Sequence, residues 1–285
     1  MRAARVGIGW GVAAACLAVV GCGTKEPTRA ALSGDCTGVA CQIDNVPGGG
    51  SSTGDAGGDA ADATAADGAS ADAATSVTVT GSLARTSDSG FLQSTAFSGA
   101  LAVWAQGPGG IDVQGTASDG SFTLDGVAPG KGNWFAAIDA TVGGGTVLST
   151  IEPLDVDAAQ PVVKLLAIDR VELQQVLFGL SLPQQPATGT GYAMLFFQKA
   201  GVSSPGVTVT APSGATVLYD SGAGYDLVAN GVTKTGDRGM AIVVGIAAPA
   251  YPGSTLSVVY DAGAGARSAA VRVAAGAVTR LFVDL

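Results

Sequence analysis

The chain has 285 residues and is 47% hydrophobic but only 13% charged, with 44 glycines and 8 phenylalanines. This length suits one or two domains, and the shortage of charged residues excludes long helices with charged faces. Without Arg2 and Arg5, residues 22–285 carry 12 basic against 23 acidic groups, a net charge of −11 that makes nucleic acid a poor partner.

The first 21 residues have the pattern of an export signal peptide. "MRAAR" supplies positive charge, an apolar run of fifteen residues (6–20) follows, and the segment ends in "VVGC". The run is short for a membrane span. This end resembles the lipobox of bacterial lipoproteins, in which a small residue precedes a cysteine. The resemblance implies that Cys22 becomes the mature N-terminus and carries diacylglycerol, since stable anchoring needs more than one acyl chain.

Two alternatives to lipidation remain open: ordinary cleavage after "AAA" (13–15), which leaves a soluble protein, and an uncleaved span. In the lipoprotein family an Asp just after the cysteine often retains the protein at the inner membrane. Gly23 and Thr24 stand there instead. The resemblance therefore implies a lipid-anchored protein of the cell envelope, at the outer membrane, on its periplasmic or surface face.

Residues 22–75 are predicted to form a disordered tether with a small cysteine loop. Cys36 and Cys41 lie five positions apart, and in an exported protein they most simply form a disulfide. Residues 47–76 contain no aromatic residue, no Ile, Leu or Val, and no positive charge. Such a segment cannot bury enough apolar surface to offset its ordering entropy. As a flexible coil it spans roughly 30 Å.

From residue 76 onward the sequence predicts β-structure, because short runs alternate apolar and polar residues between Gly- and Pro-rich turns. Two stretches recur. "GALAVWAQGPGGIDV" aligns with "GVTVTAPSGATV", and "ASDGSFTLDGVAPG" is echoed by "TGDRGMAIVVGIAAPAYPG". We therefore expect an all-β protein with two tandem β-sandwich domains at 76–166 and 188–285, the second closing with a turn at Ala275-Gly276 and a terminal strand.

The pattern "T/SxDGxFxLxGVxPGxxxW" resembles the carboxypeptidase regulatory-like domain, a transthyretin-like β-sandwich. The first unit matches well over 77–168, with an Asp-Gly turn followed by Phe122. The second unit departs from the pattern, because Arg238-Gly239 replaces Asp-Gly and Ala241 stands where the first unit has Phe122. The resemblance implies a non-catalytic accessory or binding module, although a fold alone does not license a function.

Residues 167–187 are predicted to link the two domains through a short helix at 170–180. Asp169 followed by Glu172 has the spacing of a capping box, and two prolines follow the helix. Its apolar face would contain Val176, Leu177 and Leu180. The alternative is a strand that continues "VVKLLAI".

The chain contains few residues that could form a catalytic or metal site. It has no histidine, which excludes His-dependent triads, His-metal sites and zincin helices. Asp155 and Asp157 would project from one strand face roughly 7 Å apart, a distance that suits an inverting glycosidase or a calcium contact. A solvated strand edge is the simpler interpretation. We expect no catalytic residue, no cofactor and no metal.

Trp104 is the candidate ligand contact. In "LAVWAQ", Leu101 and Val103 share one strand face and Trp104 lies on the other. If the first two residues are core, Trp104 faces outward, where it contacts a ligand or is covered by a loop or a neighbouring domain. Trp134 alternates with Ala136 and is expected in the core.

These observations together predict a lipid-anchored envelope protein without enzymatic activity. Its β-sandwich modules would hold a protein partner near the membrane. The alternatives are a carbohydrate-binding accessory lipoprotein, motivated by Trp104, and a hydrolase acting through Asp155 and Asp157.

Overall fold

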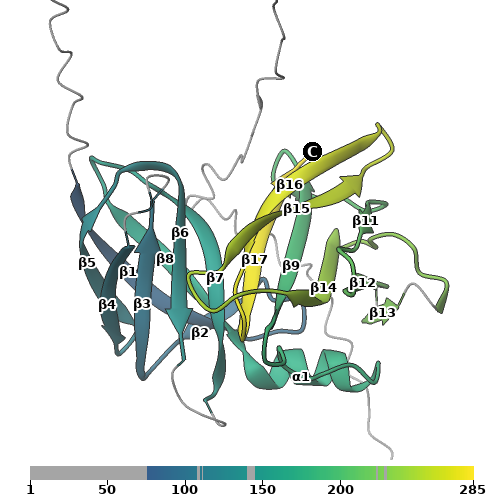
Figure 1. The fold of residues 1–285 in the computed structure, drawn as a ribbon, viewed down its shortest axis with the longest axis horizontal. Helices are drawn as coiled ribbons and strands as arrows, with labels where there is room; N and C mark the ends of the chain where they lie inside the picture. The colour runs from purple at the N-terminus through teal and green to yellow at the C-terminus, as the bar shows by residue number, and fades with distance from the viewer. Residues whose placement is uncertain (1–75, 108–109, 111, 140–144, 223, 228–229) are drawn as a thin grey trace, which may run out of the picture. The chain divides into compact units, whose positions relative to one another are not determined.

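The computed structural model describes residues 76–285 apart from 108–109, 111, 140–144, 223 and 228–229 (Figure 1). The predictions for Cys22, Cys36, Cys41 and the tether lie outside the described residues. The described part consists of β-strands and one helix, which confirms the all-β class. None of its helical structure is long and apolar enough to cross a membrane.

The first half of the described chain forms eight strands. They are β1 (Val77–Thr86), β2 (Ser94–Ala96), β3 (Ala100–Gln106), β4 (Asp112–Ser118), β5 (Ser121–Val127), β6 (Gly130–Ile138), β7 (Val147–Val156) and β8 (Val162–Asp169). Seven of them close into a ring in the order β1-β5-β4-β3-β6-β7-β8, and β8 returns to β1 as a parallel neighbour. The short strand β2 extends the β1 edge.

The ring encloses a core that the alternating sequence pattern predicts. Phe122, Leu124 and Val127 of β5 are all buried in it, as expected from "SDGSFTLDGV". Asp119 and Gly120 turn the chain from β4 into β5, with φ of 49° and 75°, the left-handed conformation that an Asp-Gly turn supplies. The local turn chemistry and the inward face therefore agree with the sequence.

Helix α1 (Arg170–Phe178) follows β8 directly and confirms the predicted linker helix, two residues shorter than expected. The Asp169 carboxylate accepts hydrogen bonds from the backbone N–H groups of Val171 and Glu172. In a full capping box the Glu172 side chain would accept a hydrogen bond from the Asp169 N–H. Here the Asp169 N–H donates to the Thr86 hydroxyl at 2.8 Å instead. The helix buries Leu173 and Leu177 rather than the triplet expected from sequence; Val176 and Leu180 are partly buried beside them.

The second half forms two packed sheets. Its strands are β9 (Thr190–Lys199), β10 (Val202–Ser203), β11 (Thr208–Thr210), β12 (Thr216–Asp220), β13 (Tyr225–Leu227), β14 (Met240–Ala247), β15 (Ser254–Asp261), β16 (Ala266–Val273) and β17 (Ala277–Asp284). One sheet runs β13-β12-β14-β9-β17, and the other runs β11-β15-β16. The predicted turn at Ala275-Gly276 joins β16 to β17, with Gly276 at φ 79°.

Strand β9 lies in the interior of the larger sheet, between β14 and β17. Its run "GYAMLFF" is buried residue after residue, because one face lies on the sandwich core and the other on the helix-side core. A strand covered on both faces carries a continuous apolar run instead of an alternating one. It pairs in parallel with β17, and in antiparallel fashion with β14.

Tyr219 connects the two sheets of the second half. Its hydroxyl accepts a hydrogen bond from the Val209 N–H at 2.7 Å and donates to the Val209 carbonyl at 3.1 Å. The side chain belongs to β12 and its partner to β11, so one buried phenol holds the short strand of the smaller sheet onto the larger sheet.

We predict that Tyr219→Phe lowers the free energy of unfolding by about 1–3 kcal/mol, because the Val209 N–H loses its acceptor in a buried place. Urea denaturation of the two proteins measures the difference. The matched control is Tyr260→Phe, whose ring is also buried. Equal losses in both variants would contradict the special role of Tyr219.

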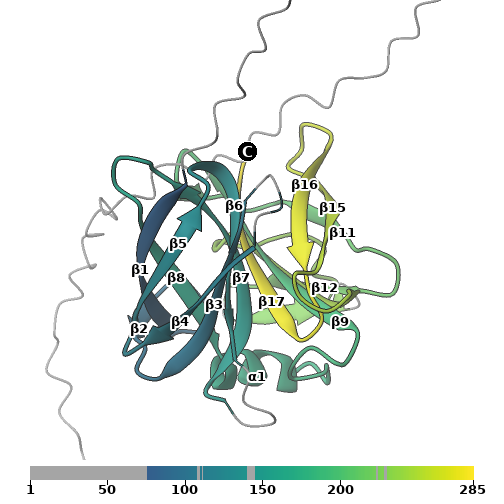
Figure 2. The ribbon, with the colours of Figure 1, turned by 60° about the vertical axis from the view of Figure 1, so that its left-hand side comes forward.

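The two halves are joined by hydrogen bonds of the sheet itself. Strand β17 pairs in parallel with β7 over Ala277↔Ser149, Val278↔Thr150 and Thr279↔Ile151. Figures 1 and 2 both show the yellow β17 alongside β7. The larger sheet is therefore continuous from β13 to β2, which differs from the expectation of two separate sandwiches tied only by a helical linker. The domain boundaries at 166 and 188 stay a prediction.

A loop of the first half adds a second connection. Phe91 is fully buried at φ 55° in the core formed by α1, β9, β12 and β14. Its ring lies 6.3 Å from that of Tyr225, whose hydroxyl donates to the Ser89 carbonyl at 2.8 Å. Asp88 holds the loop by accepting two backbone hydrogen bonds. Leu148 of β7 and Ile168 of β8 belong to the same cluster, so the two halves share this core.

Candidate functional site

The most constrained polar site is a wedge where β8 and β17 separate along one edge of β7. Strand β8 pairs with β7 only at Val147 and Leu148, and β17 then takes the next three positions. Beyond the backbone pairing, side chains of β7 accept hydrogen bonds from the backbone of β8. The Thr150 hydroxyl accepts from the Ile168 N–H at 2.9 Å, and the Glu152 carboxylate accepts from the Leu166 N–H at 3.3 Å.

Glu152 also forms a buried ion pair with Arg280 of β17. The two side chains are 7% and 4% exposed, and their charged atoms lie 2.5 Å apart. The Arg280 guanidinium stacks over the rings of Phe282 and Phe196, at 4.7 and 5.1 Å from their centroids. Burial raises the pKa of Glu152 above its ordinary value, and Arg280 opposes that rise. The pair is enclosed by protein, so it holds strands together and offers no carboxylate to a substrate.

Trp104 lies on the outer face of the ring, as the sequence predicts. Leu101 and Val103 are in the ring core, and Trp104 is half-buried on the opposite face. Its indole meets the ring of Tyr251 from the second half, with centroids 5.0 Å apart and planes tilted by 57°. The contact from the neighbouring half is one of the two situations expected for this residue. Ligand contact stays a prediction.

Trp134 differs from its expected place. It is only partly buried and packs outside the ring, in a cluster with Ala136, Ile151 and Ala277. The strand alternation was correct, but the apolar face of β6 that includes Trp134 faces the second half instead of the ring core. One face of β6 packs on the ring core and the other packs against the second half. Both faces are therefore apolar, and the sequence pattern alone does not tell which face lies in the ring core.

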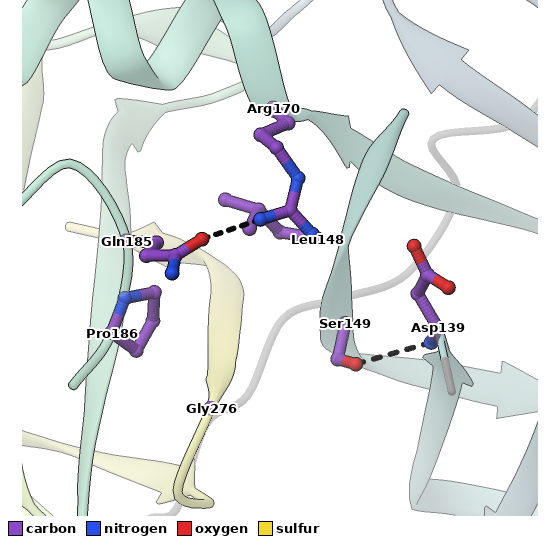
Figure 3. Close-up of a pocket in the computed structure, with 7 residues that line it drawn as sticks. All are labelled: Asp139, Leu148, Ser149, Arg170, Gln185, Pro186 and Gly276. Carbon is purple, nitrogen blue, oxygen red and sulfur yellow. Dashed lines mark hydrogen bonds between the residues drawn. The ribbon is translucent and has the colours of Figure 1, made fainter. Parts of the chain in front are cut away.

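A small hollow lies beside the start of α1 (Figure 3). Its volume is about 180 Å³, and its lining consists of Asp139, Leu148, Ser149, Arg170, Gln185, Pro186 and Gly276. The Arg170 guanidinium donates to the Gly145 and Val147 carbonyls at 2.7 and 3.3 Å and to the Gln185 side chain. Sites for small-molecule ligands usually measure about 300–1,000 Å³. The hollow therefore suits a few water molecules, and its arginine serves to fix the surrounding loops.

The two candidate acids lie at the end of β7. Asp155 lies near the end of β7 and is half-buried, whereas Asp157 follows the strand and accepts a hydrogen bond from the Ala159 N–H at 2.8 Å. Within the described part of the chain, no three Cys, Asp or Glu side chains gather as metal ligands would. The hydrolase interpretation gains no support from this geometry.

Sequence analysis missed Glu152, Arg280 and Tyr251. The first two had a visible signal, because each is a charged residue inside an apolar strand, in "VLSTIEPLDV" and "AVTRLFVD". Such residues are rarely buried unless they are paired. Tyr251 lies in a Pro-rich connection between strands, and no local pattern links it to Trp104.

Comparison with known proteins gives little. No family model matches the sequence, and neither does any curated protein. Among solved structures, the chain aligns with GBS52, the minor pilin in the gram-positive pathogen Streptococcus agalactiae, with 12% identity and a TM-score of 0.20, covering 73% of this chain and 94% of that chain. A TM-score this low carries no argument about fold or function.

We predict strong coupling between Glu152 and Arg280. Glu152→Leu and Arg280→Met each leave an uncompensated buried charge and should lower the free energy of unfolding by about 3–5 kcal/mol. The double variant should recover most of the combined loss, because an apolar pair replaces an ion pair. A double-mutant cycle by urea denaturation measures the coupling. Additive losses would show that the pair does not act as a unit.

We also predict a pH dependence that Glu152→Gln removes. The folded state holds the Glu152 proton more tightly than the unfolded chain, whose pKa is near the ordinary 4.5. Between pH 4.5 and the raised pKa, the folded state therefore binds more protons at Glu152 than the unfolded chain does. As pH rises through that window, the contribution of Glu152 to the free energy of unfolding decreases. The difference in free energy of unfolding between wild type and variant, measured across this range, should show that slope. The opposite slope would mean a lowered pKa.

Proposed function

We propose that the protein is a lipid-anchored, non-catalytic binding module of the cell envelope. The observation that carries this is the sequence "VVGC" after a short apolar run, which makes Cys22 the attachment point. The acidic, Gly- and Ala-rich tether then spaces the folded body from the membrane. On this proposal the first half follows the transthyretin-like plan that its motif resembles, and the protein faces the periplasm or the cell surface at the outer membrane.

The structure of the body supports a binding role. The charged pair Glu152–Arg280 is enclosed between strands. The two halves of the body are joined by a shared sheet and a shared core. Such a body presents fixed surfaces to a partner with little ordering cost. The leading partner is another envelope protein, held near the membrane. A glycan is the second candidate, favoured by the half-buried Trp104–Tyr251 pair.

Labelling with a tagged fatty acid tests the anchor. The wild-type chain should incorporate the label and sediment with membranes, while Cys22→Ala should do neither, because the thiol is the attachment chemistry. Cys16→Ala is the matched control and should label like wild type, since that residue lies in the predicted leader. Equal labelling of wild type and Cys22→Ala would refute lipidation.

Cross-linking in whole cells tests the partner. The anchored protein, tagged at its C-terminus, should capture one envelope protein in stoichiometric amount. Capture should fall in Cys22→Ala, because the tether no longer keeps the body at the membrane. Recovery of nothing above that control would count against a protein partner.

A further inference from the structure

Strand β16 is the longest strand that ends a sheet in the described part of the chain. The other end strands are β2, β11 and β13, each of three residues, whereas β16 has eight. Short edge strands are one device by which proteins avoid pairing with other chains, and a long edge is a template for another strand. Within the described residues no strand pairs with the second edge of β16, drawn in yellow in Figure 2.

The first five residues of β16, 266–270, form its accessible part. The first three of them are exposed and the next two are half-buried. Beyond them β17 covers the strand, because the Thr279 hydroxyl donates to the Arg272 carbonyl and Val271 is buried. The accessible stretch therefore has Ser268 at its centre.

A small groove of about 40 Å³ lies beside this stretch, between β16 and β17. Ser268 and Ala269 line it on one side, and residues 281–284 of β17 line it on the other. Ala269 packs against the core of the sandwich, and by strand alternation Arg267 is on the same face. Arg267 and Asp284 are both exposed, and neither forms an ion pair within the described residues.

We propose that β16 pairs in antiparallel fashion with β16 of a second copy of this chain, about a two-fold axis at Ser268. Residues directly opposite in an antiparallel pair share a face, so a two-fold axis perpendicular to the sheet places one residue opposite its own counterpart. With the axis at the centre of the accessible stretch, Arg267 lies opposite Ala269 of the second copy, and Ala266 lies opposite Ala270. The two small sheets become one sheet of six strands.

Charge complementarity favours a second copy over another strand. A charged side chain on an edge usually opposes pairing. Opposite Ala269, however, Arg267 of the second copy points to the groove that Asp284 lines, and the symmetry repeats this contact on the other side. Each copy supplies the cation for one groove and the carboxylate for the other. This inference goes beyond the proposed function, because the pairing does not require the lipid anchor.

Oxidation of the purified full chain with copper phenanthroline tests the register. Ser268→Cys should form a disulfide-linked dimer well above the wild-type background, because Cα atoms directly opposite, about 4.5–5.5 Å apart, are within disulfide range. Ala270→Cys is the matched control. It should stay at background, because its counterpart lies four residues along the strand, about 13 Å away. A mixture of Ala266→Cys and Ala270→Cys chains should cross-link again.

Sedimentation velocity of the same full chain tests the charge complementarity. Arg267→Glu should weaken dimerisation by about 10-fold or more, because it brings two carboxylates together. The double variant Arg267→Glu with Asp284→Arg should recover most of that loss. Lys131→Glu, a charge reversal on β6, should dimerise like wild type. All three side chains are exposed, so these variants should fold.

Three results would overturn the inference: a monomeric wild type, equal cross-linking of Ser268→Cys and Ala270→Cys, or no recovery in the double charge variant. Failure of lipid labelling at Cys22 would bear on the proposed function alone, because the dimer is measured on purified protein.

Discussion

Strand β7 has one edge for which two strands compete, and the way this edge is shared determines the architecture. Its first two residues pair with β8 and close the ring, and its next three pair with β17 and begin the second half. A strand edge can satisfy only one neighbour at each position. Beyond the two positions that pair with β8, the side chains of Thr150 and Glu152 accept hydrogen bonds from β8, and Glu152 also neutralises Arg280 of β17.

The buried ion pair joins β7 to β17 at an energetic cost. Two charges lose hydration, and the cation–π contacts with Phe196 and Phe282 offset part of that loss. A well-packed apolar pair of similar volume would often cost less. Phe91 adds a second connection by filling the core beneath α1. The surface around Trp104 and Tyr251 follows from these two connections, since each half contributes one ring.

The sequence predicts the local features well and the long-range features poorly. The Asp119-Gly120 turn, the inward face of β5 and the Asp169 cap depend on residues within a few positions of one another, and all three are present. The parallel pairing of β17 with β7 joins residues more than a hundred positions apart, and no turn chemistry encodes it. Trp134 was misplaced for the same reason, because strand alternation cannot say which of two apolar neighbours covers a face.

The candidate site shows the same division. The outward position of Trp104 was predictable from "LAVWAQ", whereas its partner Tyr251 comes from a distant connection. Glu152 and Arg280 could have been flagged as charges within apolar strands, but not matched to each other.

Differential scanning calorimetry of the full chain tests most directly whether the two halves form one cooperative body. If the β7–β17 pairing and the Glu152–Arg280 wedge unite them, unfolding gives one transition whose calorimetric and van't Hoff enthalpies agree. Two separable transitions, or a calorimetric enthalpy about twice the van't Hoff value, would mean that the halves unfold independently and that the wedge does not join them.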